Sequence, residues 1–515
     1  MQTFHKLRIP SDIVARLGKL NITRPSPPQI HAIKALNQPP VTHTHLPKPP
    51  KVAVLKYPTG TGKTLAYALP LLARIKKSNQ AEREQQKGLQ AVVVCPTREL
   101  VLQTLHTMKK LTGSGKINKK GNHLVVDSAL GQVNSVMESK YRLHPPDILI
   151  GTPQPLARLL FNGVVPFVSS VTDRFLILDE VNALVQPFRW PHVARILAAP
   201  LPRYGARNAS LWPPLSSLAD KVVWEPSPPD KGQGLWRQGS LWMVSATATK
   251  AVSTKILGQA DISDEPMHIT CDRNLPPTTR HVILEAPHAP LHEILRDILR
   301  PQVRAPRRRI PANEACTNEA GPRVRARRRR IPASEAGTNE VDEPTSDSAA
   351  NNDATDPNPL GWYETFRHSR IRDRRVLLFV RSSEEAESLA VTLRASNIGV
   401  ASFHSGVGDA KYGSVARFTA LNSFARGAAK VLIATNMLSI GVDFPWVTHV
   451  VLTDPPATAE EYVHYAGRAG RFGGYFGTVV TLASSIAATD RLRGFCEELS
   501  FPLENQLEEM GDGFE

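Results

Sequence analysis

The sequence contains a short glycine-rich run, PTGTGKT at 58–64, whose residue types suit the binding of a phosphate chain. An apolar segment at 51–57 precedes it and a stretch with helical apolar spacing follows, so the run lies between an expected strand and an expected helix. In that context its glycines let backbone N–H groups close around phosphates, its lysine reaches the β- and γ-phosphates, and its last threonine holds Mg²⁺. The residues in these roles are Gly60, Gly62, Lys63 and Thr64. Tyr57 stands where the general pattern has a further glycine, but the context favours a nucleotide site over a ligand-free turn.

Two acidic residues, Asp179 and Glu180, follow the apolar run FLIL in FLILDEVNAL. Ligands of open α/β sheets bind at the carboxyl ends of the strands, where these residues are expected. Asp179 would hold Mg²⁺ through water, while Glu180 would orient or deprotonate the water that attacks the γ-phosphate. An acidic pair at a strand end is by itself more often a helix cap, but the glycine-rich run upstream favours the catalytic interpretation.

Apolar runs of strand length alternate with amphipathic stretches over most of the chain, a pattern typical of α/β domains with parallel sheets. The expected strands lie at 51–57, 91–95, 147–150, 175–179, 241–245, 375–380, 430–435, 447–453 and 477–483. We therefore expect two similar domains, residues 1–300 and 361–515, with a long linker between them. A stretch rich in Pro and Trp, 201–240, is interpreted as a surface insertion in the first domain.

The linker, 301–360, has no aromatic residue and contains two near-identical copies of one sequence, at 303–319 and 324–340. An Asp/Asn/Pro/Ser-rich tail follows the second copy. Such a composition buries too little apolar surface to offset the entropy of ordering, so this Arg-rich segment is expected to be disordered. Its Arg runs could direct nuclear import or touch RNA, but solvated low-complexity sequence is the simpler interpretation.

Composition narrows the class of partner and compartment. Lys and Arg outnumber Asp and Glu by 63 to 47, a net charge of +16, which favours a polyanionic partner such as nucleic acid. No stretch of about 18 apolar residues occurs and no signal-peptide pattern opens the chain, so a membrane partner and secretion are excluded at this level. The four cysteines, at 95, 271, 316 and 496, lack C-x-x-C spacing, which argues against disulfides and zinc and for a reducing intracellular compartment.

Taken together, the motifs of the chain resemble those of the DEAD-box RNA helicases of superfamily 2, which are proteins with two RecA-like domains. In the first domain ITRPSPPQ at 22–29 is similar to the family's Q motif, PTREL at 96–100 to motif Ia, DEVN at 179–182 to motif II, and SAT at 245–247 to motif III. The resemblance implies that Gln29 reads adenine and Phe4 stacks on it, and it adds Thr59 and Thr61 to the phosphate loop. It also assigns coupling between sites to Asn182, Ser245 and Thr247, and RNA contacts to Pro96, Thr97, Arg98, Gly131 and Thr152.

The second domain carries the remaining motifs of the resemblance. LLFVRS at 377–382 looks like motif IV, and YVHYAGRAGR at 462–471 looks like motif VI. By this resemblance Arg468 and Arg471 are arginine fingers for the γ-phosphate, His464 is a coupling residue and Asp443 contacts the nucleotide. Arg417, Thr435 and Gly441 would contact RNA. The implied cofactors are ATP and Mg²⁺, and the implied ligand is the sugar–phosphate backbone of one RNA strand, bound without sequence preference.

The departures from the family pattern fall on the coupling and RNA side. They are Asn182 for the last Asp of motif II, Ile440 and Tyr465 for arginines of motifs V and VI, Gln154-Pro155 in motif Ib, and Ser414 for a glutamine. Losing an acid at 182 together with a base at 465 suggests that a charged interdomain contact became neutral. ATP binding is therefore a firmer expectation than unwinding.

The function that these features predict is an RNA-dependent ATPase that unwinds short RNA duplexes or remodels RNPs, in RNA processing or ribosome assembly. An ATP-gated RNA clamp that unwinds poorly is the first alternative, favoured by the departures. A DNA-translocating superfamily 2 helicase is the second, disfavoured by the Q motif and PTREL. We expect a monomer, with RNP or ribosome assembly factors as further partners.

The expected compartment is only weakly indicated by the sequence. Residues 1–20 are basic and amphipathic, and the motif pattern faintly resembles fungal mitochondrial members of the family, so a mitochondrial location is favoured over the nucleus or cytoplasm. Because Phe4 already belongs to the Q motif, we expect this helix to be part of the fold and an upstream targeting segment to be missing.

Overall fold

The computed structural model of this chain describes two α/β domains. The described residues are 3–37, 51–57, 60–77, 88–113, 124–167, 174–199, 236, 239–270, 275, 279–285, 290–299, 374–404, 413–436, 444, 447–470 and 477–505. The repeat-bearing segment predicted to be disordered, 301–360, lies outside them. No helix among the described residues has the length and apolar character needed to cross a membrane.

Seven parallel strands form the first sheet, in the order β3-β4-β2-β5-β6-β1-β7. Their bounds are β1 Val52–Lys56, β2 Ala91–Val94, β3 Val126–Ala129, β4 Ile148–Gly151, β5 Phe175–Asp179, β6 Ser240–Ser245 and β7 Met267–Thr270. The inner strands are nearly continuous runs of Val, Ile and Leu, because both of their faces are covered by helices. Since all seven run the same way, every carboxyl end lies at one edge of the sheet.

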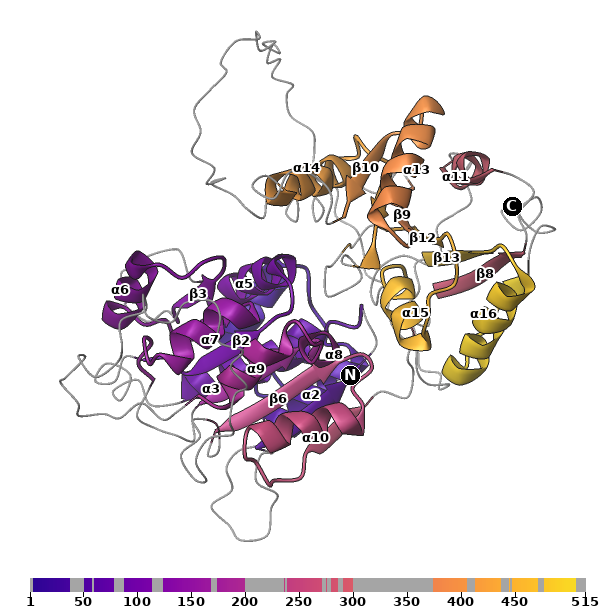
Figure 1. The fold of residues 1–515 in the computed structure, drawn as a ribbon. Helices are drawn as coiled ribbons and strands as arrows, with labels where there is room; N and C mark the ends of the chain where they lie inside the picture. Colours follow the sequence, from indigo (N-terminus) through magenta and orange to yellow (C-terminus); the bar gives the residue numbers. More distant parts are fainter. Residues whose placement is uncertain are drawn as a thin grey trace, which may run out of the picture. The chain divides into compact units, whose positions relative to one another are not determined.

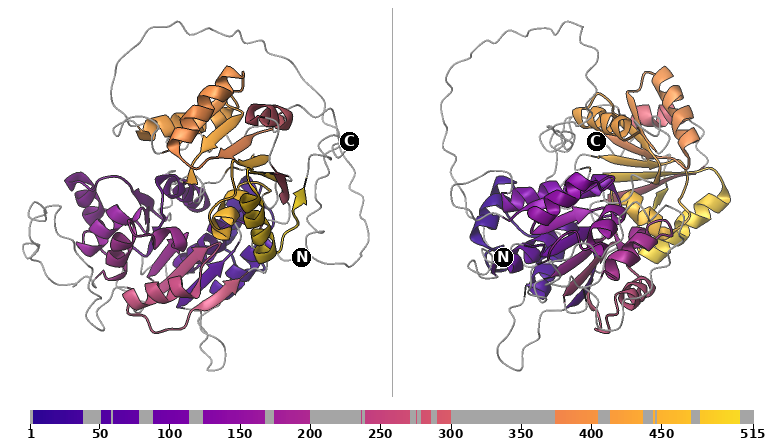
Figure 2. Two further views of the ribbon diagram at one scale, coloured as in Figure 1. Left: turned by 45° about the vertical axis from the view of Figure 1, so that its right-hand side comes forward. Right: turned by 60° about the vertical axis from the view of Figure 1, so that its left-hand side comes forward.

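Alternate residues of these strands point into two different cores. Leu55 and Ile177 belong to the core beneath one set of helices, while Val54 and Leu178 belong to the core beneath the other set. Helices lie on both faces of this sheet (Figures 1 and 2). The first set is α1 Ser11–Lys19, α2 Pro27–Leu36, α3 Lys63–Lys77 and α5 Arg98–Thr112. The second set is α6 Ser135–Leu143, α7 Pro153–Phe161, α8 Val181–Leu184, α9 Trp190–Leu197 and α10 Lys250–Gln259.

The second sheet is also parallel and has the order β10-β11-β9-β12-β13-β8-β14. Its strands are β8 Thr279–Glu285, β9 Val376–Phe379, β10 Val400–Phe403, β11 Val431–Ala434, β12 His449–Leu452, β13 Gly477–Ala483 and β14 Glu504–Asn505. Helices α11 Leu291–Leu299 and α13 Ser383–Ala395 pack on one face. Helices α14 Gly413–Arg426, α15 Ala459–Ala466 and α16 Ile486–Leu499 pack on the other. The prediction of two parallel-sheet α/β domains is confirmed.

Two expected boundaries differ from the structure. Strand β8 is part of the second sheet and helix α11 packs on that sheet. The second domain therefore begins before 279 and not after 300 as expected. The expected surface insertion, 201–240, also ends differently: Trp236 is fully buried, its Nε1 donates to the carbonyl of Ile196 at 2.8 Å, and Ser240 already begins β6. Residues 201–235 lie outside the described part. Burial of a large aromatic ring explains why the end of this stretch joins the core.

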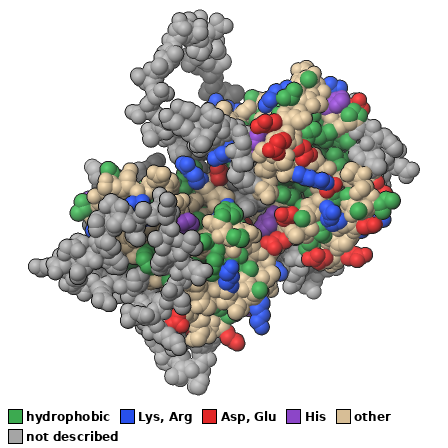
Figure 3. All heavy atoms as spheres, in the orientation of Figure 1, with side chains coloured by type: hydrophobic (Ala, Val, Ile, Leu, Met, Phe, Trp, Pro, Cys, Tyr) green, Lys and Arg blue, Asp and Glu red, His purple; other side chains and the backbone are tan. Residues whose placement is uncertain are grey.

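The face shown in Figure 3 carries Lys and Arg side chains interspersed with Asp and Glu, and no single continuous basic patch is seen on it. The excess of positive charge in the sequence therefore does not by itself mark a binding surface on this face.

Candidate active site

The strand order of the first sheet divides the predicted site residues into two groups along its carboxyl edge. The neighbours β5, β6 and β1 end at Asp179, at Ser245 and just before the glycine-rich loop, the residues predicted for nucleotide and coupling. The neighbours β3, β4 and β2 lead to Gly131, Thr152 and Thr97, the residues predicted for RNA. We call these the nucleotide half and the RNA half of the edge. The sheet thus brings together residues that are far apart in the sequence.

The glycine-rich loop has the backbone that a phosphate cradle needs. Gly60 and Gly62 adopt φ values of 76° and 84°, a left-handed region open mainly to glycine, and α3 begins at Lys63. A Cβ added to Gly62 would lie 2.3 Å from Nε2 of Gln29, so a side chain at this position would displace the end of the Gln29 side chain. Thr59 lies outside the described residues.

The first turn of α2 is tied to this loop by two side chains. The hydroxyl of Ser26 donates to the carbonyl of Thr61 at 3.1 Å, and Nε2 of Gln29 donates to the carbonyl of Gly62 at 3.3 Å. Gln29 also completes a capping box, since its Oε1 accepts from the backbone N–H of Ser26 at 3.0 Å. The amide predicted to read adenine therefore also holds the phosphate loop against α2. Its role towards adenine stays a prediction.

Phe4, predicted to stack on adenine, is 1% exposed and belongs to the core beneath α1 and α2. A base could stack on this ring only if the ring became uncovered. Its role therefore stays a prediction, while its packing role is observed.

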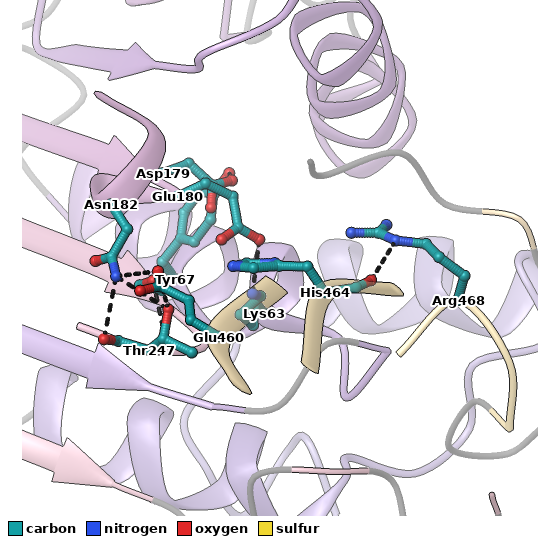
Figure 4. A network of polar contacts seen from close by, with 10 residues as sticks. Lys63, Tyr67, Asp179, Glu180, Asn182, Thr247, Glu460, His464 and Arg468 are labelled. Atoms are coloured by element: carbon teal, nitrogen blue, oxygen red, sulfur yellow. Dashed lines mark hydrogen bonds and ion pairs between the residues drawn. The ribbon is translucent and has the colours of Figure 1, made fainter. Parts of the chain in front are cut away.

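Lys63 and Glu180 form a largely buried ion pair at the centre of the nucleotide half. Nζ of Lys63 lies 2.7 Å from Oε1 of Glu180 (Figure 4). Glu180 occupies the N-cap position of α8 with φ 54° and ψ 58°, a left-handed conformation that is costly for a residue with a side chain. This sharp turn joins β5 to α8 and lets Asp179 and Glu180 stand side by side at the strand end.

The two carboxylates differ in their tendency to ionise. Burial, with a contribution from neighbouring Glu180, raises the pKa of Asp179 to about 7 against the opposing effect of Lys63. Burial also acts against ionisation of Glu180, but Lys63, followed by His464, outweighs it and holds the pKa of Glu180 below its ordinary value. Environments that push two pKa values apart are typical of sites in which the two acids have different tasks. An ionised Glu180 suits the proposed base.

A residue that sequence reasoning missed supports Asp179. The phenol of Tyr67 donates to Oδ2 of Asp179 at 3.0 Å, and burial raises the pKa of Tyr67 above its ordinary value. Tyr67 follows Lys63 by one helical turn on α3, so both side chains leave the same face. That spacing was the signal that could have found it.

Asn182 has a different partner from the one expected. Its Nδ2 donates to the carbonyl of Thr247 at 3.1 Å, to the Thr247 hydroxyl at 3.0 Å, and to Oε1 of Glu460 at the start of α15 (Figure 4). The Thr247 hydroxyl in turn donates to the same Glu460 oxygen at 2.7 Å. Because every atom facing Nδ2 is an acceptor, a flipped amide would set oxygen against oxygen, which fixes the orientation.

This contact corrects the expectation of a neutral contact at positions 182 and 465. The amide of Asn182 meets the carboxylate of Glu460, and Tyr465 instead packs its ring on Phe379 with centroids 4.4 Å apart. A tyrosine is apolar enough to join the core of the second sheet, which an arginine at this position would not do. Glu460 was not predicted, because nothing in its local sequence distinguishes it from Glu461.

Ser245 holds the turn after β6 and does not reach Asn182 in the structure. Its hydroxyl accepts from the backbone N–H of Thr247 at 3.2 Å. Of the two motif III residues predicted for coupling, Thr247 is the one that contacts Asn182 and Glu460.

His464 and Arg468 lie at the end of α15 and just beyond it. Nε of Arg468 donates to the carbonyl of His464 at 3.1 Å, and the Arg468 side chain is buried (Figure 4). Burial lowers the pKa of Arg468 to about 10 and also lowers the pKa of His464, while Glu180 opposes both shifts. Arg468 remains charged at neutral pH and lies within electrostatic reach of Glu180. Three further residues predicted for nucleotide or RNA contact in this domain, Arg471, Asp443 and Gly441, lie outside the described residues, as does Ile440.

The residues predicted for RNA in the first domain occupy helix starts and turns. Thr97 caps α5 through its hydroxyl, which accepts from the N–H of Leu100 at 3.3 Å, and Arg98 beside it is exposed. Gly131 is exposed with φ 72°, and Thr152 precedes the first turn of α7. In that turn the two motif Ib departures divide, Gln154 being exposed and Pro155 buried.

In the second domain Thr435 follows β11 and is buried, and Arg417 is half-buried on α14. Ser414 lies in the first turn of that helix. RNA contact by these residues, and by Pro96, stays a prediction.

Asp179 and Thr64 offer donors that suit Mg²⁺. This ion binds through one or two carboxylates, a hydroxyl and substrate phosphates, and keeps several waters. Asp179 ends β5, and Thr64 lies in the first turn of α3, the helix that follows β1. Strands β5 and β1 both end in the nucleotide half of the edge. The residues present therefore fit such an ion arriving with a nucleotide.

Comparisons with known proteins agree with this geometry. A family model described as DEAD/DEAH box helicase matches residues 27–253, and one described as helicase conserved C-terminal domain matches residues 363–473. DEAD-box ATP-dependent RNA helicase 47A of Oryza sativa subsp. japonica is 30% identical over 224 residues, 43% of this chain and 36% of the relative. The mitochondrial DEAD-box ATP-dependent RNA helicase 47 of Arabidopsis thaliana is 29% identical over 191 residues, 36% of this chain and 31% of the relative.

The matched region spans about a third of the length of these two relatives. Among solved structures, S. cerevisiae Dbp5 bound to RNA and ADP BeF3 aligns over 100% of this chain and 98% of its own, with TM-score 0.63 and 17% identity, a likeness of fold. The two family models together match more than half of the sequence. The first covers motifs around the first sheet, and the second covers motifs around the second sheet. The chain belongs to the DEAD/DEAH box helicase family.

Proposed function

We propose that this chain is an RNA-dependent ATPase that couples ATP hydrolysis to local unwinding of RNA duplexes or to RNP remodelling. The observation that carries the proposal is the buried Lys63–Glu180 pair beside Asp179, with Arg468 within electrostatic reach of it. A lysine, two carboxylates with separated pKa values and a buried arginine are what phosphoryl transfer to water requires.

In this proposal each residue has one task. Lys63 leaves Glu180 to bind the β- and γ-phosphates, which frees the Glu180 carboxylate to orient and deprotonate the attacking water. Arg468 stabilises the charge that develops on the γ-phosphoryl group. Asp179 and Thr64 would hold Mg²⁺, which would supply neutralisation of the phosphate charge.

RNA is the proposed activator. Thr97, Gly131 and Thr152 follow three neighbouring strands, an arrangement that could track the backbone of a single strand along the RNA half of the edge. The exposed Arg98 supplies a charge for phosphate. RNA processing or ribosome assembly, with RNP factors as partners, is the proposed setting. A mitochondrial location is supported by the name of the Arabidopsis relative, and a fluorescent fusion of the full-length protein would test it.

An ATP-gated RNA clamp that unwinds poorly is a second candidate. It is favoured by Asn182, whose partner is an acidic side chain, and by Tyr465, whose ring packs in a core instead of offering a cation. A clamp needs ATP-dependent RNA binding, whereas a helicase must also displace a strand.

The decisive experiment measures ATP hydrolysis and strand displacement side by side, with RNA and with DNA of the same sequence. We expect hydrolysis to be stimulated by RNA and a short duplex to be displaced. Stimulation without displacement would select the clamp, and equal stimulation by DNA would favour a DNA-directed enzyme.

Glu180→Gln is the matched control for this experiment, since the amide keeps the size of the carboxylate and cannot take up a proton. It should lose about 10²–10⁴ in turnover and still bind ATP. Turnover within about threefold of the parent would place the catalytic carboxylate elsewhere.

A further inference from the structure

An aromatic side chain at the carboxyl edge of the first sheet is largely exposed. Phe188, in the turn between α8 and α9, is 68% exposed and belongs to none of the hydrophobic clusters formed by the described residues. Trp190, two residues later, packs against the core under α9 and shows what a structural aromatic looks like at this place. An exposed phenylalanine ring leaves apolar surface in water that a ligand could cover.

The ring of Phe188 is backed by a fixed cation. The guanidinium carbon of Arg189 lies 4.2 Å from the centroid of the Phe188 ring. Arg189 is itself held at two carbonyls: Nε donates to Pro96 at 3.1 Å and Nη1 donates to Ala183 at 3.2 Å. Bonds to two separate segments restrict the guanidinium, and the ring beside it is thereby held in place at low entropic cost.

These contacts locate the ring between the two halves of the edge. Pro96 follows β2, the last strand of the RNA half, and Ala183 lies in α8 after β5, the first strand of the nucleotide half. Strands β2 and β5 are direct neighbours. The turn that carries Phe188 is therefore tied to the residue next to Thr97 and Arg98, which are proposed to contact RNA.

We propose that Phe188 is a stacking platform for one base of single-stranded RNA, an inference that rests on the proposed function. A planar ring with a cation beside it, next to residues suited to a phosphate backbone, is the combination by which proteins bind single strands without reading sequence. A protein partner would need a wider apolar surface. The other exposed large hydrophobic side chains of the described residues lie elsewhere, on α6, β7, α13 and α16 and beside β3.

The test is the affinity of the full-length protein for labelled oligouridylate, measured by fluorescence anisotropy with a non-hydrolysable ATP analogue. Phe188→Ala should weaken binding by about tenfold, the usual scale of one base stacked on an aromatic ring. Phe188→Leu should be equally weak, because it restores apolar area without a π-face, and Phe188→Trp should bind as the parent does. On an oligonucleotide that lacks bases, the parent and Phe188→Ala should bind equally.

Salt dependence separates stacking from charge. Phe188→Ala should leave the slope of log Kd against log salt unchanged, whereas Arg98→Ala should reduce it by about one. Ile486→Ala, which removes a side chain that is 83% exposed on α16, is the matched surface control and should bind RNA as the parent does.

Three outcomes would overturn the platform. They are binding by Phe188→Ala within about twofold of the parent, rescue by Phe188→Leu, and an equal loss on the oligonucleotide without bases. If the parent itself fails to bind RNA, the proposed function falls and the platform with it. If the parent binds RNA and the Phe188 substitutions leave that binding unchanged, the proposed function stands without the platform.

Discussion

Strands β1 and β8 hold the same place in the two sheets, sixth of seven in each order, but they lead into different chemistry. β1 runs into PTGTGKT, with two left-handed glycines and Lys63 at the start of α3. β8 runs into APHAP, which has neither the glycines nor the lysine that a phosphate needs. Two domains with one architecture therefore differ by a few residues at a strand end, and the function of each depends on those residues and not on the fold.

The second domain contributes charged side chains, whereas the first contributes the glycine-rich loop that suits phosphate. Arg468 is buried near the end of α15, and Glu460 at the start of that helix receives Asn182 and Thr247. If this division of tasks is right, damage to the second domain should impair turnover and leave nucleotide binding to the first. Four experiments can break or sharpen it.

The largest expected effect is that of Arg468→Ala on RNA-stimulated hydrolysis. Loss of an arginine that stabilises transition-state charge should lower turnover by about 10³ or more, while the affinity for a fluorescent ATP analogue changes little. Arg468→Lys, which keeps the charge, checks that the loss is not a folding defect. Arg493→Ala, on the exposed side of α16, should be as active as the parent. Full activity of Arg468→Ala would remove the finger assignment and leave the clamp ahead.

The second effect is on stability in acid. His281 on β8 is buried against Tyr462 and Phe501, and burial lowers its pKa from 6.5 to about 4. Its folded pKa lies below the unfolded value, so its contribution is fully present above pH 6.5 and falls as the pH drops towards 4. The total loss is about 3 kcal/mol at about 1.4 kcal/mol per pH unit.

His281→Gln keeps a hydrogen-bonding side chain and cannot titrate. Between pH 7 and pH 5 the parent should lose about 2 kcal/mol more free energy of unfolding than this variant, measured by urea denaturation. Equal losses in the two proteins would show that folding does not lower the pKa of His281. β1 offers no titratable residue before Lys56, so the two corresponding strands should differ in this respect.

The third effect tests whether the cradle depends on Gln29. Gln29→Glu keeps the acceptor that caps α2 but loses the N–H that binds the Gly62 carbonyl and is proposed to read adenine. The preference for ATP over GTP should fall by about tenfold, the scale of a lost base contact. The melting temperature should fall as well, because a buried carboxylate oxygen would face the Gly62 carbonyl. Unchanged nucleotide preference would leave Gln29 with its structural role alone.

The smallest effect concerns the contact between Asn182 and Glu460. Asn182→Asp would place an anion against the Glu460 carboxylate and the Thr247 carbonyl, and should lower RNA-stimulated turnover severalfold with ATP affinity kept. Adding Glu460→Gln supplies an N–H for the new aspartate and should restore most of the loss. The neighbouring Glu461→Gln is the matched control and should not rescue. Full activity of Asn182→Asp alone would show that this contact does not couple the two domains.

Much of the fold could be predicted because parallel strands buried on both faces are legible in the sequence. FLILD became β5 and AVVV became β2 as expected. Strands such as β3, VDSA, and β10, VASF, were missed because polar residues interrupt their apolar pattern. No strand was expected at β8, and its residues were assigned to the first domain, since pairing between β8 and β13 joins residues about 200 positions apart and leaves no local mark.

The sequence by itself determined the chemistry that is set by neighbours along the chain: the glycines and Lys63 of the loop, and the acids at the end of β5. Spacing along one loop or helix is enough to specify such groups. Only the tertiary structure decided which distant groups meet, such as Tyr67 with Asp179, Glu460 with Asn182, and Arg189 with the carbonyl of Pro96. The physical reason is that the packing of strands and helices brings these side chains together, and a hydrogen bond between residues 93 or more positions apart leaves no periodic pattern in the sequence.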